Sequence, residues 1–306
     1  MGRNMFLTLS DMLLIISVIF IISAIIVIIY FAFYSSRFQG LLQRKGDRNI
    51  LNDYSSFVAN FAGPLFAIGG SLILYSTIIE QNRKDNVNRF ESVFFKLVDY
   101  HRENNLNIKT SSDPFKGREM EGKQLFTNMY NHMKATTKLV HSIYPNMTDS
   151  SLANISYQIF YIGKSSEAQR VQLRKSLKKY ENQLQIDTLY ARLDAFSDSI
   201  RTVNETRYHF FDGNKTKLSH YFTQYFKVIS YVMQQEFLLP EEKAFYIDML
   251  QSQNGFYENI IINLYLMSDS ADKNHKSLSQ YAALKEEERE YVNMMLFSKS
   301  KSDGQD

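Results

Sequence analysis

The six histidines are the first candidates for chemistry in this sequence, and their spacing matches no metal-binding or catalytic motif. His132 and His141 are nine residues apart, about 13 Å along one helix, which is too far to share a metal ion. No HExxH motif occurs, and the adjacent Ser219 and His220 define no triad, because a triad is a spatial arrangement. We therefore predict no catalytic residue, no metal ligand and no cofactor. Each histidine is interpreted as a hydrogen-bonded core or surface residue.

Composition and charge exclude further classes. Cysteine is absent, which excludes disulfide bonds, thiolate catalysis and Cys-ligated metal centres. The first 79 residues hold 5 of the 35 basic and 3 of the 32 acidic side chains, so 30 and 29 remain in the rest of the chain. This balance argues against a nucleic-acid partner. The basic run from Lys164 to Lys179 would suit anionic lipid or nucleic acid, but the flanking Glu167 and Glu181 favour a solvated helix face.

One segment has the spacing of a phosphate-binding loop without its chemistry. Residues 117–123 read GREMEGK, which matches GxxxxGK. Gln124 follows where a Ser or Thr should hold magnesium, and Glu119 and Glu121 place negative charge where phosphate would bind. No hydrophobic strand precedes the segment. We expect a loop that enters a helix, not a nucleotide site.

Two uncharged segments of 23 residues each predict a pair of transmembrane helices. They cover residues 12–34 and 57–79, and each is long enough to cross the roughly 30 Å hydrocarbon core. We expect a short tail at residues 1–11 and a connecting loop at residues 35–56. A buried helix of a soluble protein and a cleaved signal peptide fit such long runs less well.

Small residues in the second segment predict close packing. Ala59, Gly63 and Ala67 lie one turn apart, a spacing that allows another helix to approach, and Pro64 predicts a kink. The partner helix would be the first segment or, in a homo-oligomer, another copy of the chain.

The basic residues on the two sides of the predicted spans are nearly equal in number, so they do not decide the orientation in the membrane. Four basic residues lie in the connecting loop and five lie on the opposite side, close to a tie under the positive-inside rule. The free amino group favours a cytoplasmic location for both termini.

The rest of the chain predicts a soluble multi-helix domain over residues 80–298. Only 4 Pro and 12 Gly occur, and no run alternates like a strand. Apolar and aromatic side chains instead recur at helical spacing, as at Phe90, Phe94 and His101. We expect residues 299–306 to be a disordered tail. The predicted fold class is all-α, a two-helix transmembrane hairpin followed by this domain.

Aromatic and polar motifs follow one another along the domain. They lie in residues 89–102, 117–126, 210–226 and 246–263. Their distinctive positions are Phe94, Phe95, His101, Gly117, Arg118, His220, Tyr221, Phe222, Tyr225, Glu258 and Asn263. The order of these segments after a two-span anchor resembles the phage abortive infection family, the AbiC-like membrane proteins of bacteria. The resemblance covers most of residues 80–268.

This resemblance implies anti-phage defence and names no reaction. Together with the two predicted spans, it predicts a two-pass protein of the bacterial inner membrane, and the charge argument above places both termini and the helical domain in the cytoplasm. The expected partners are the lipid bilayer and a phage or host protein. This chain departs from the family at Thr223 and Gln251, where members tend to have Arg.

Two other functions stay open. One is a helical nuclease-type effector enzyme, although ribonuclease toxins of the higher-eukaryote-and-prokaryote nucleotide-binding class typically carry an Arg shortly before their His. No histidine here has an Arg five to seven positions before it, and His141 has Lys134 at that place. The other is a membrane-tethered signalling or scaffold protein.

The motif residues themselves have two interpretations. Tyr221, Phe222 and Tyr225 share one helical face, which favours a place in the core over contact with a partner. Glu258 and Asn263 stand on an otherwise apolar helix, where buried hydrogen bonding and a functional role are equally plausible.

Overall fold

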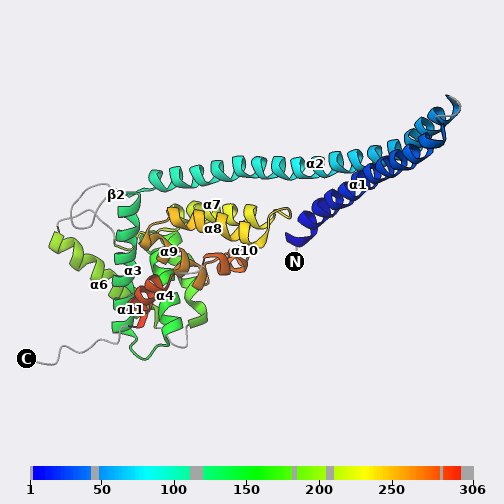
Figure 1. The fold of residues 1–306 in the computed structure, drawn as a ribbon. Helices are drawn as coiled ribbons and strands as arrows, with labels where there is room; N and C mark the ends of the chain where they lie inside the picture. Colours follow the sequence, from blue (N-terminus) through cyan, green and yellow to red (C-terminus); the bar gives the residue numbers. More distant parts are fainter. Residues whose placement is uncertain are drawn as a thin grey trace, which may run out of the picture. The chain divides into compact units, whose positions relative to one another are not determined.

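The computed structural model describes residues 3–42, 48–110, 120–180, 185–204, 210–282 and 285–297, which form an all-α fold as predicted (Figure 1). The chain divides into two compact units. Unit 1 comprises Met1–Ser92 with Phe237–Leu239, and unit 2 comprises Val93–Glu236 with Pro240–Asp306.

Eleven α-helices and two short 3-10 helices make up these described residues, together with one pair of two-residue strands. The strands β1 (Lys109–Thr110) and β2 (Met120–Glu121) are antiparallel, with Lys109 opposite Glu121. The helices are α1 (Arg3–Leu42), α2 (Arg48–Asn107), α3 (Lys123–Ile143), α4 (Asp149–Ile162), α5 (Glu167–Leu177), η1 (Lys178–Tyr180), α6 (Ile186–Asn204), α7 (Lys215–Met233), α8 (Pro240–Gln253), α9 (Phe256–Met267), α10 (Lys273–Ser277), η2 (Ser279–Ala282) and α11 (Glu286–Phe297).

The first two helices are long and apolar enough to cross a membrane. The stretches that meet this test are Leu9–Tyr30 in α1 and Ala59–Leu106 in α2. Both helices extend beyond the predicted spans, so most of the loop expected at residues 35–56 is helical and its centre, 43–47, lies outside the described residues. Apolar runs mark where a helix can lie in lipid, but they do not mark where the helix ends, because capping and helix-breaking residues set the ends.

Small side chains spaced seven residues apart join α1 to α2 within unit 1. The hydroxyl oxygens of Ser10 and Ser76 are 2.7 Å apart. Seven residues further into each helix, Ser17 faces Gly69, where a Cβ atom would lie 3.3 Å from the Ser17 carbonyl oxygen. One more repeat leads to the buried Ala24 and Ala62. A seven-residue repeat keeps one seam of each helix facing its partner, and small residues in that seam let the backbones approach closely.

This seam replaces the contact predicted from the sequence. Ala59, Gly63 and Ala67 are exposed, and no atom would lie within 4 Å of a Cβ at Gly63. The prediction that this face meets the first segment was wrong, because a four-residue repeat and a seven-residue repeat of small residues occupy different faces of α2. Contact of this face with another copy of the chain stays a prediction. The helix continues through Pro64.

The chain has no cysteine, so the contact between α1 and α2 can be tested directly by introducing a pair of cysteines. In a Ser10→Cys, Ser76→Cys double variant, mild oxidation should form a disulfide, since the two hydroxyl oxygens are already 2.7 Å apart. The matched control is Ser10→Cys with Thr77→Cys, because Thr77 is the next residue and is exposed. Loss of both free thiols would be measured by thiol-reactive polymer labelling. Equal cross-linking in the two variants would contradict the seam.

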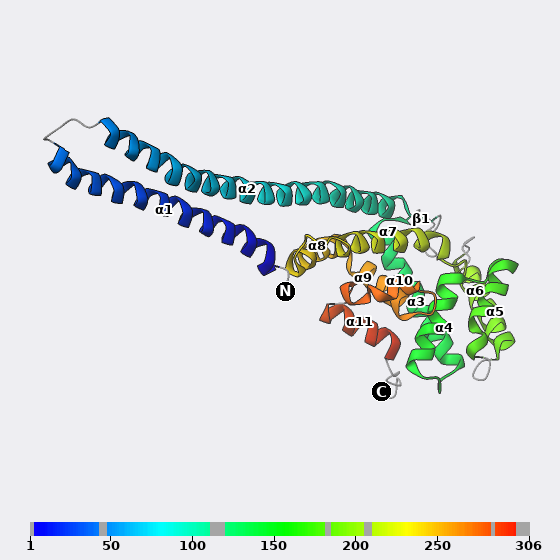
Figure 2. The same cartoon turned by 90° about the vertical axis from the view of Figure 1, so that its right-hand side faces the viewer.

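The core of unit 2 forms around α3, α4 and α9, which contact one another, while α4 also packs on α5 (Figure 2). Aromatic rings fill much of this core. Phe222 of α7 stacks on Tyr265 of α9 with ring centroids 4.0 Å apart. Tyr221, Phe222 and Tyr225 are all buried, which confirms the core interpretation of their shared face.

Two glycines in unit 2 lie back to back where the α4–α5 turn meets the turn before α7. Gly163 and Gly213 have φ values of 78° and 80°, a region that side-chain-bearing residues rarely adopt. A Cβ atom on Gly213 would lie 2.2 Å from the carbonyl oxygen of Ile162. The absence of both side chains lets the Lys164 amide donate to Phe211 O at 2.8 Å. Glycine is therefore required here by contact as well as by conformation.

Candidate functional site

A group of buried and half-buried polar side chains in unit 2 unites three segments that are far apart in sequence. We call it the His101 cluster. Its members are His101 and Asn105 of α2, Tyr221 and Tyr225 of α7, Asn254 in the turn before α9, and Glu258 of α9.

Glu258 is the centre of the hydrogen bonds in this cluster. Its side chain is 1% exposed. The Tyr221 hydroxyl donates to Oε1 at 2.5 Å and Asn105 Nδ2 donates to the same oxygen at 2.8 Å. The backbone amide of Gly255 donates to Oε2 at 3.0 Å, which caps the first turn of α9. The carboxylate therefore links α2, α7 and α9.

His101 lies beside this carboxylate in an aromatic setting. It is 2% exposed, and its ring centroid is 4.9 Å from that of Tyr221 and 5.5 Å from that of Tyr225. Among the described residues, neither ring nitrogen has a partner in hydrogen-bonding geometry. Burial lowers the pKa of His101 to about 4, against a smaller opposing effect of the nearby Asn254. The imidazole is therefore neutral at pH 7.

Both tyrosines of the cluster keep their protons. Burial raises the pKa of Tyr221 well above its usual range, and the charge of Glu258 together with the hydrogen bond to it raises the pKa further. Burial also raises the pKa of Tyr225, although the nearby Asn254 side chain opposes the effect. Tyr221 can therefore act only as a hydrogen-bond donor to the carboxylate at neutral pH.

Four positions that the sequence singled out thus meet in one place: His101, Tyr221, Tyr225 and Glu258. Two further members, Asn105 and Asn254, were missed. A signal was available for Asn105, since it is four residues after His101 and so shares its helical face. Asn254 lies in the turn between α8 and α9, where helical periodicity gives no signal.

The other motif positions lie elsewhere. Phe94 is buried against Tyr246, with ring centroids 5.1 Å apart, whereas Phe95 is 44% exposed. His220 is exposed on α7. Asn263 donates to the carbonyl oxygens of Asn259 and Ala282, so its role is structural hydrogen bonding.

The segment with phosphate-loop spacing enters a helix, as expected. Gly122 precedes α3 with a φ of 57°, directly after the two-residue strand β2. Gly117 and Arg118 lie outside the described residues.

The two departures from the family have different surroundings. Thr223 is exposed and its hydroxyl donates to the Ser219 carbonyl oxygen at 2.8 Å. Gln251 is half-buried, donates to Tyr281 O, and lies close enough to Tyr225 to influence the pKa of its hydroxyl. Gln251 therefore borders the His101 cluster and Thr223 does not.

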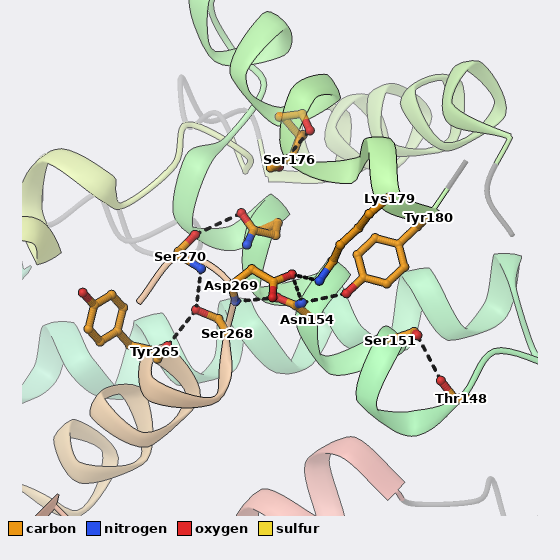
Figure 3. A network of polar contacts seen from close by, with 12 residues as sticks. Thr148, Ser151, Asn154, Ser176, Lys179, Tyr180, Tyr265, Ser268, Asp269 and Ser270 are labelled. Carbon is orange, nitrogen blue, oxygen red and sulfur yellow. Dashed lines mark hydrogen bonds and ion pairs between the residues drawn. The ribbon is translucent and has the colours of Figure 1, made fainter. Parts of the chain in front are cut away.

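A second polar network in unit 2 joins α4, η1 and the turn after α9 (Figure 3). The backbone amide of Asp269 donates to Asn154 Oδ1 at 3.1 Å, while Asn154 Nδ2 donates to the Tyr180 hydroxyl at 2.7 Å. Lys179 forms an ion pair with Asp269. Burial alone would raise the pKa of Asp269, but the bonds from Lys179 and Asn154 outweigh it and lower the pKa. These contacts connect η1 and the turn after α9 to α4.

A second buried histidine, His132, lies among aromatic rings. Its ring centroid is 3.8 Å from that of Phe210, with Phe160 and Phe211 further out. Burial lowers the pKa of His132 from 6.5 to about 3, and the charge of Lys217 adds to the effect. The described residues contain no group of three or more His, Asp and Glu side chains that could hold a metal ion.

Comparisons with protein-family models, curated proteins and solved structures found no match. The resemblance to the abortive infection family therefore rests on the sequence motifs alone.

Replacing the central carboxylate should destabilise the protein. In Glu258→Gln, one amide group must face either the Gly255 amide or the Tyr221 hydroxyl, and both of these are donors. We expect the free energy of unfolding to fall by about 2 kcal/mol, the usual cost of an unsatisfied buried group. Denaturant unfolding of the full chain in micelles measures this. Glu103→Gln, at an exposed site on α2, is the control; an equal loss in both variants would contradict the central role of Glu258.

The histidines should make stability depend on pH. Below pH 6.5 the unfolded chain protonates His132, but the folded chain resists until about pH 3, so stability falls as the pH falls between these values. For His132 alone, the loss between pH 6.5 and 5 is about 2 kcal/mol.

The variant His132→Gln should flatten this slope, leaving the part that His101 contributes in the same direction. Denaturant titrations at a series of pH values measure it. The control is His220→Gln at an exposed position, which should keep the wild-type slope. A slope that His132→Gln leaves unchanged would show that His132 is already charged in the folded protein.

Proposed function

We propose that this chain is a membrane-anchored bacterial phage-defence protein whose helical unit 2 binds a phage or host component. Under this proposal α1 and α2 form a two-pass anchor in the cell membrane, with both termini in the cytoplasm. Infection would act through the bound component to stop growth of the cell before phage is released.

One observation carries the proposal more than any other. The motif positions on which the family resemblance depends include His101, Tyr221 and Glu258, which belong to three distant segments and yet share one buried cluster. Their convergence supports treating the motifs as one structural unit.

The second support is the make-up of α2. This helix contains the second apolar stretch and also His101 and Asn105 of the cluster. A membrane anchor and the motif residues therefore belong to one continuous helix. The exposed small residues Ala59, Gly63 and Ala67 leave a face of α2 that a second copy of the chain would fit.

Phage plating tests the proposal directly. Cells that express the full-length chain should give fewer plaques than cells with an empty vector, for at least part of a diverse phage panel. Tyr221→Phe should weaken this protection, because it removes only the hydroxyl that holds Glu258. The matched control is Tyr100→Phe, which removes a hydroxyl from an exposed position on α2. Immunoblots of the membrane fraction must show equal amounts of each variant.

The outcomes separate the three functional classes. Unchanged plaque counts across the panel would contradict defence and favour a signalling or scaffold role. Protection accompanied by degraded cellular RNA or DNA, and lost in His101→Gln or His220→Gln, would favour the nuclease. Protease treatment of right-side-out and inside-out vesicles tests the orientation, and cleavage of unit 2 from outside intact cells would contradict the cytoplasmic placement.

A further inference from the structure

The seam between α1 and α2 fixes the height of one helix relative to the other. Ser10 and Ser76 form a hydrogen bond at 2.7 Å, and seven residues further into each helix Ser17 faces Gly69. The helices are antiparallel (Figure 2), so each step forward along α1 corresponds to one step back along α2. Residue 12 of α1 is therefore level with residue 74 of α2, and residue 29 is level with residue 57.

This register staggers the two apolar runs along the hairpin. The uncharged runs cover residues 12–34 of α1 and residues 57–79 of α2. In the register of the seam they overlap only at residues 12–29 and 57–74, which we call the shared zone, and five residues of each run extend past the other at opposite ends. The shared zone has 18 residues in each helix. It is therefore about 27 Å long, close to the roughly 30 Å hydrocarbon core of a bilayer.

The outer surface of the shared zone is mostly apolar. Among its described side chains, the buried positions are those of the seam: Ser17, Ala24, Ala62 and Gly69. Large apolar side chains such as Ile19 and Phe66 are 56% and 40% exposed. The hydroxyls of Ser17 and Ser71 donate to carbonyl oxygens of their own helices at 2.7 Å, so neither requires water. The one amide of the zone, Asn60, lies about 5 Å from its end. A helix pair with such an outer surface is suited to lipid.

Tyrosines mark both ends of the shared zone. Tyr30 follows it directly in α1 and is 65% exposed, while Tyr75 follows it directly in α2 and is 56% exposed. Their levels along the hairpin are about 28 Å apart. The nearest charged positions also lie just outside the zone, at Asp11 in α1 and Asp53 in α2. Tyrosine is enriched where hydrocarbon meets the lipid headgroups, because its ring is apolar and its hydroxyl is polar.

We propose that the hydrocarbon core of a phospholipid bilayer surrounds only the shared zone, with Tyr30 and Tyr75 at its two interfaces. The apolar ends at residues 30–34 and 75–79 then lie among the lipid headgroups. These spans differ from those that the apolar runs alone predict, because the seam would hold the centres of the two full runs about 8 Å apart along the hairpin. The proposal depends on the membrane anchor of the proposed function and is independent of the defence role.

Depth-dependent quenching in vesicles tests the proposal. The full chain is reconstituted in phosphatidylcholine and phosphatidylglycerol with one bimane-labelled cysteine, in the variants Phe33→Cys, Phe66→Cys and Ile78→Cys, all at exposed positions. Lipids brominated at different acyl positions report the depth of each label. We expect the label at position 66 near the bilayer centre, and the labels at positions 33 and 78 at equal depths, about 19 Å from the centre and outside the hydrocarbon.

The outcomes separate this proposal from the anchor itself. If the bilayer were centred on one apolar run alone, the depths of positions 33 and 78 would differ by about 8 Å. Such a difference, or either label within the hydrocarbon, would overturn the proposed depth and leave the anchor in place. No quenching at any of the three positions would overturn the anchor as well.

Thiol reactivity gives a second readout at the cytoplasmic end proposed for α2. Ser71 and Ile78 are both exposed and are seven residues apart, so they share one face of the helix. A water-soluble maleimide needs a thiolate in contact with water. In the reconstituted full chain, the cysteine of Ile78→Cys should therefore react at least about tenfold faster than that of the matched control Ser71→Cys. Equal rates would place both positions on the same side of the lipid boundary and overturn the proposal.

Discussion

A buried carboxylate is tolerated only where surrounding groups donate hydrogen bonds to it, and Glu258 sets that requirement for unit 2. Its donors are the hydroxyl of Tyr221 on α7, the amide of Asn105 on α2 and the first turn of its own helix, α9. Each helix must keep its position for the others to satisfy the charge. The aromatic rings around the cluster supply apolar contact area, but such contacts tolerate sliding, whereas these hydrogen bonds fix the register of three helices.

The second constraint is the close approach of backbones, which is possible only where the side chains are small or absent. In unit 1, Gly69 and Ser17 allow α1 and α2 to meet along a seven-residue repeat. In unit 2, Gly163 and Gly213 let two turns touch, so that backbone groups pair directly. Both places exclude larger residues for steric reasons.

Helical periodicity and apolar runs were enough to predict the all-α class, the two long apolar helices and the buried faces of α2 and α7. They could not fix the α1–α2 contact, because Ala59, Gly63 and Ala67 offer a small-residue face as plausible as that of Ala62 and Gly69. The His101 cluster was visible only in part. Periodicity along one helix pairs residues three or four apart, but it carries no information about which face of α9 meets α2.

Some motif positions are buried and others are exposed, and this difference in exposure bears on how a binding function would operate. His101, Tyr221 and Glu258 are buried, so they cannot touch a protein partner directly. His220 and Phe95 are exposed, and each is the sequence neighbour of a buried motif residue, Tyr221 or Phe94. On a helix, fixing the buried residue also fixes the direction in which its neighbour points. The buried residues Phe94 and Tyr221 therefore fix the directions in which Phe95 and His220 point. Under the proposed function, such exposed side chains are the ones a partner could contact.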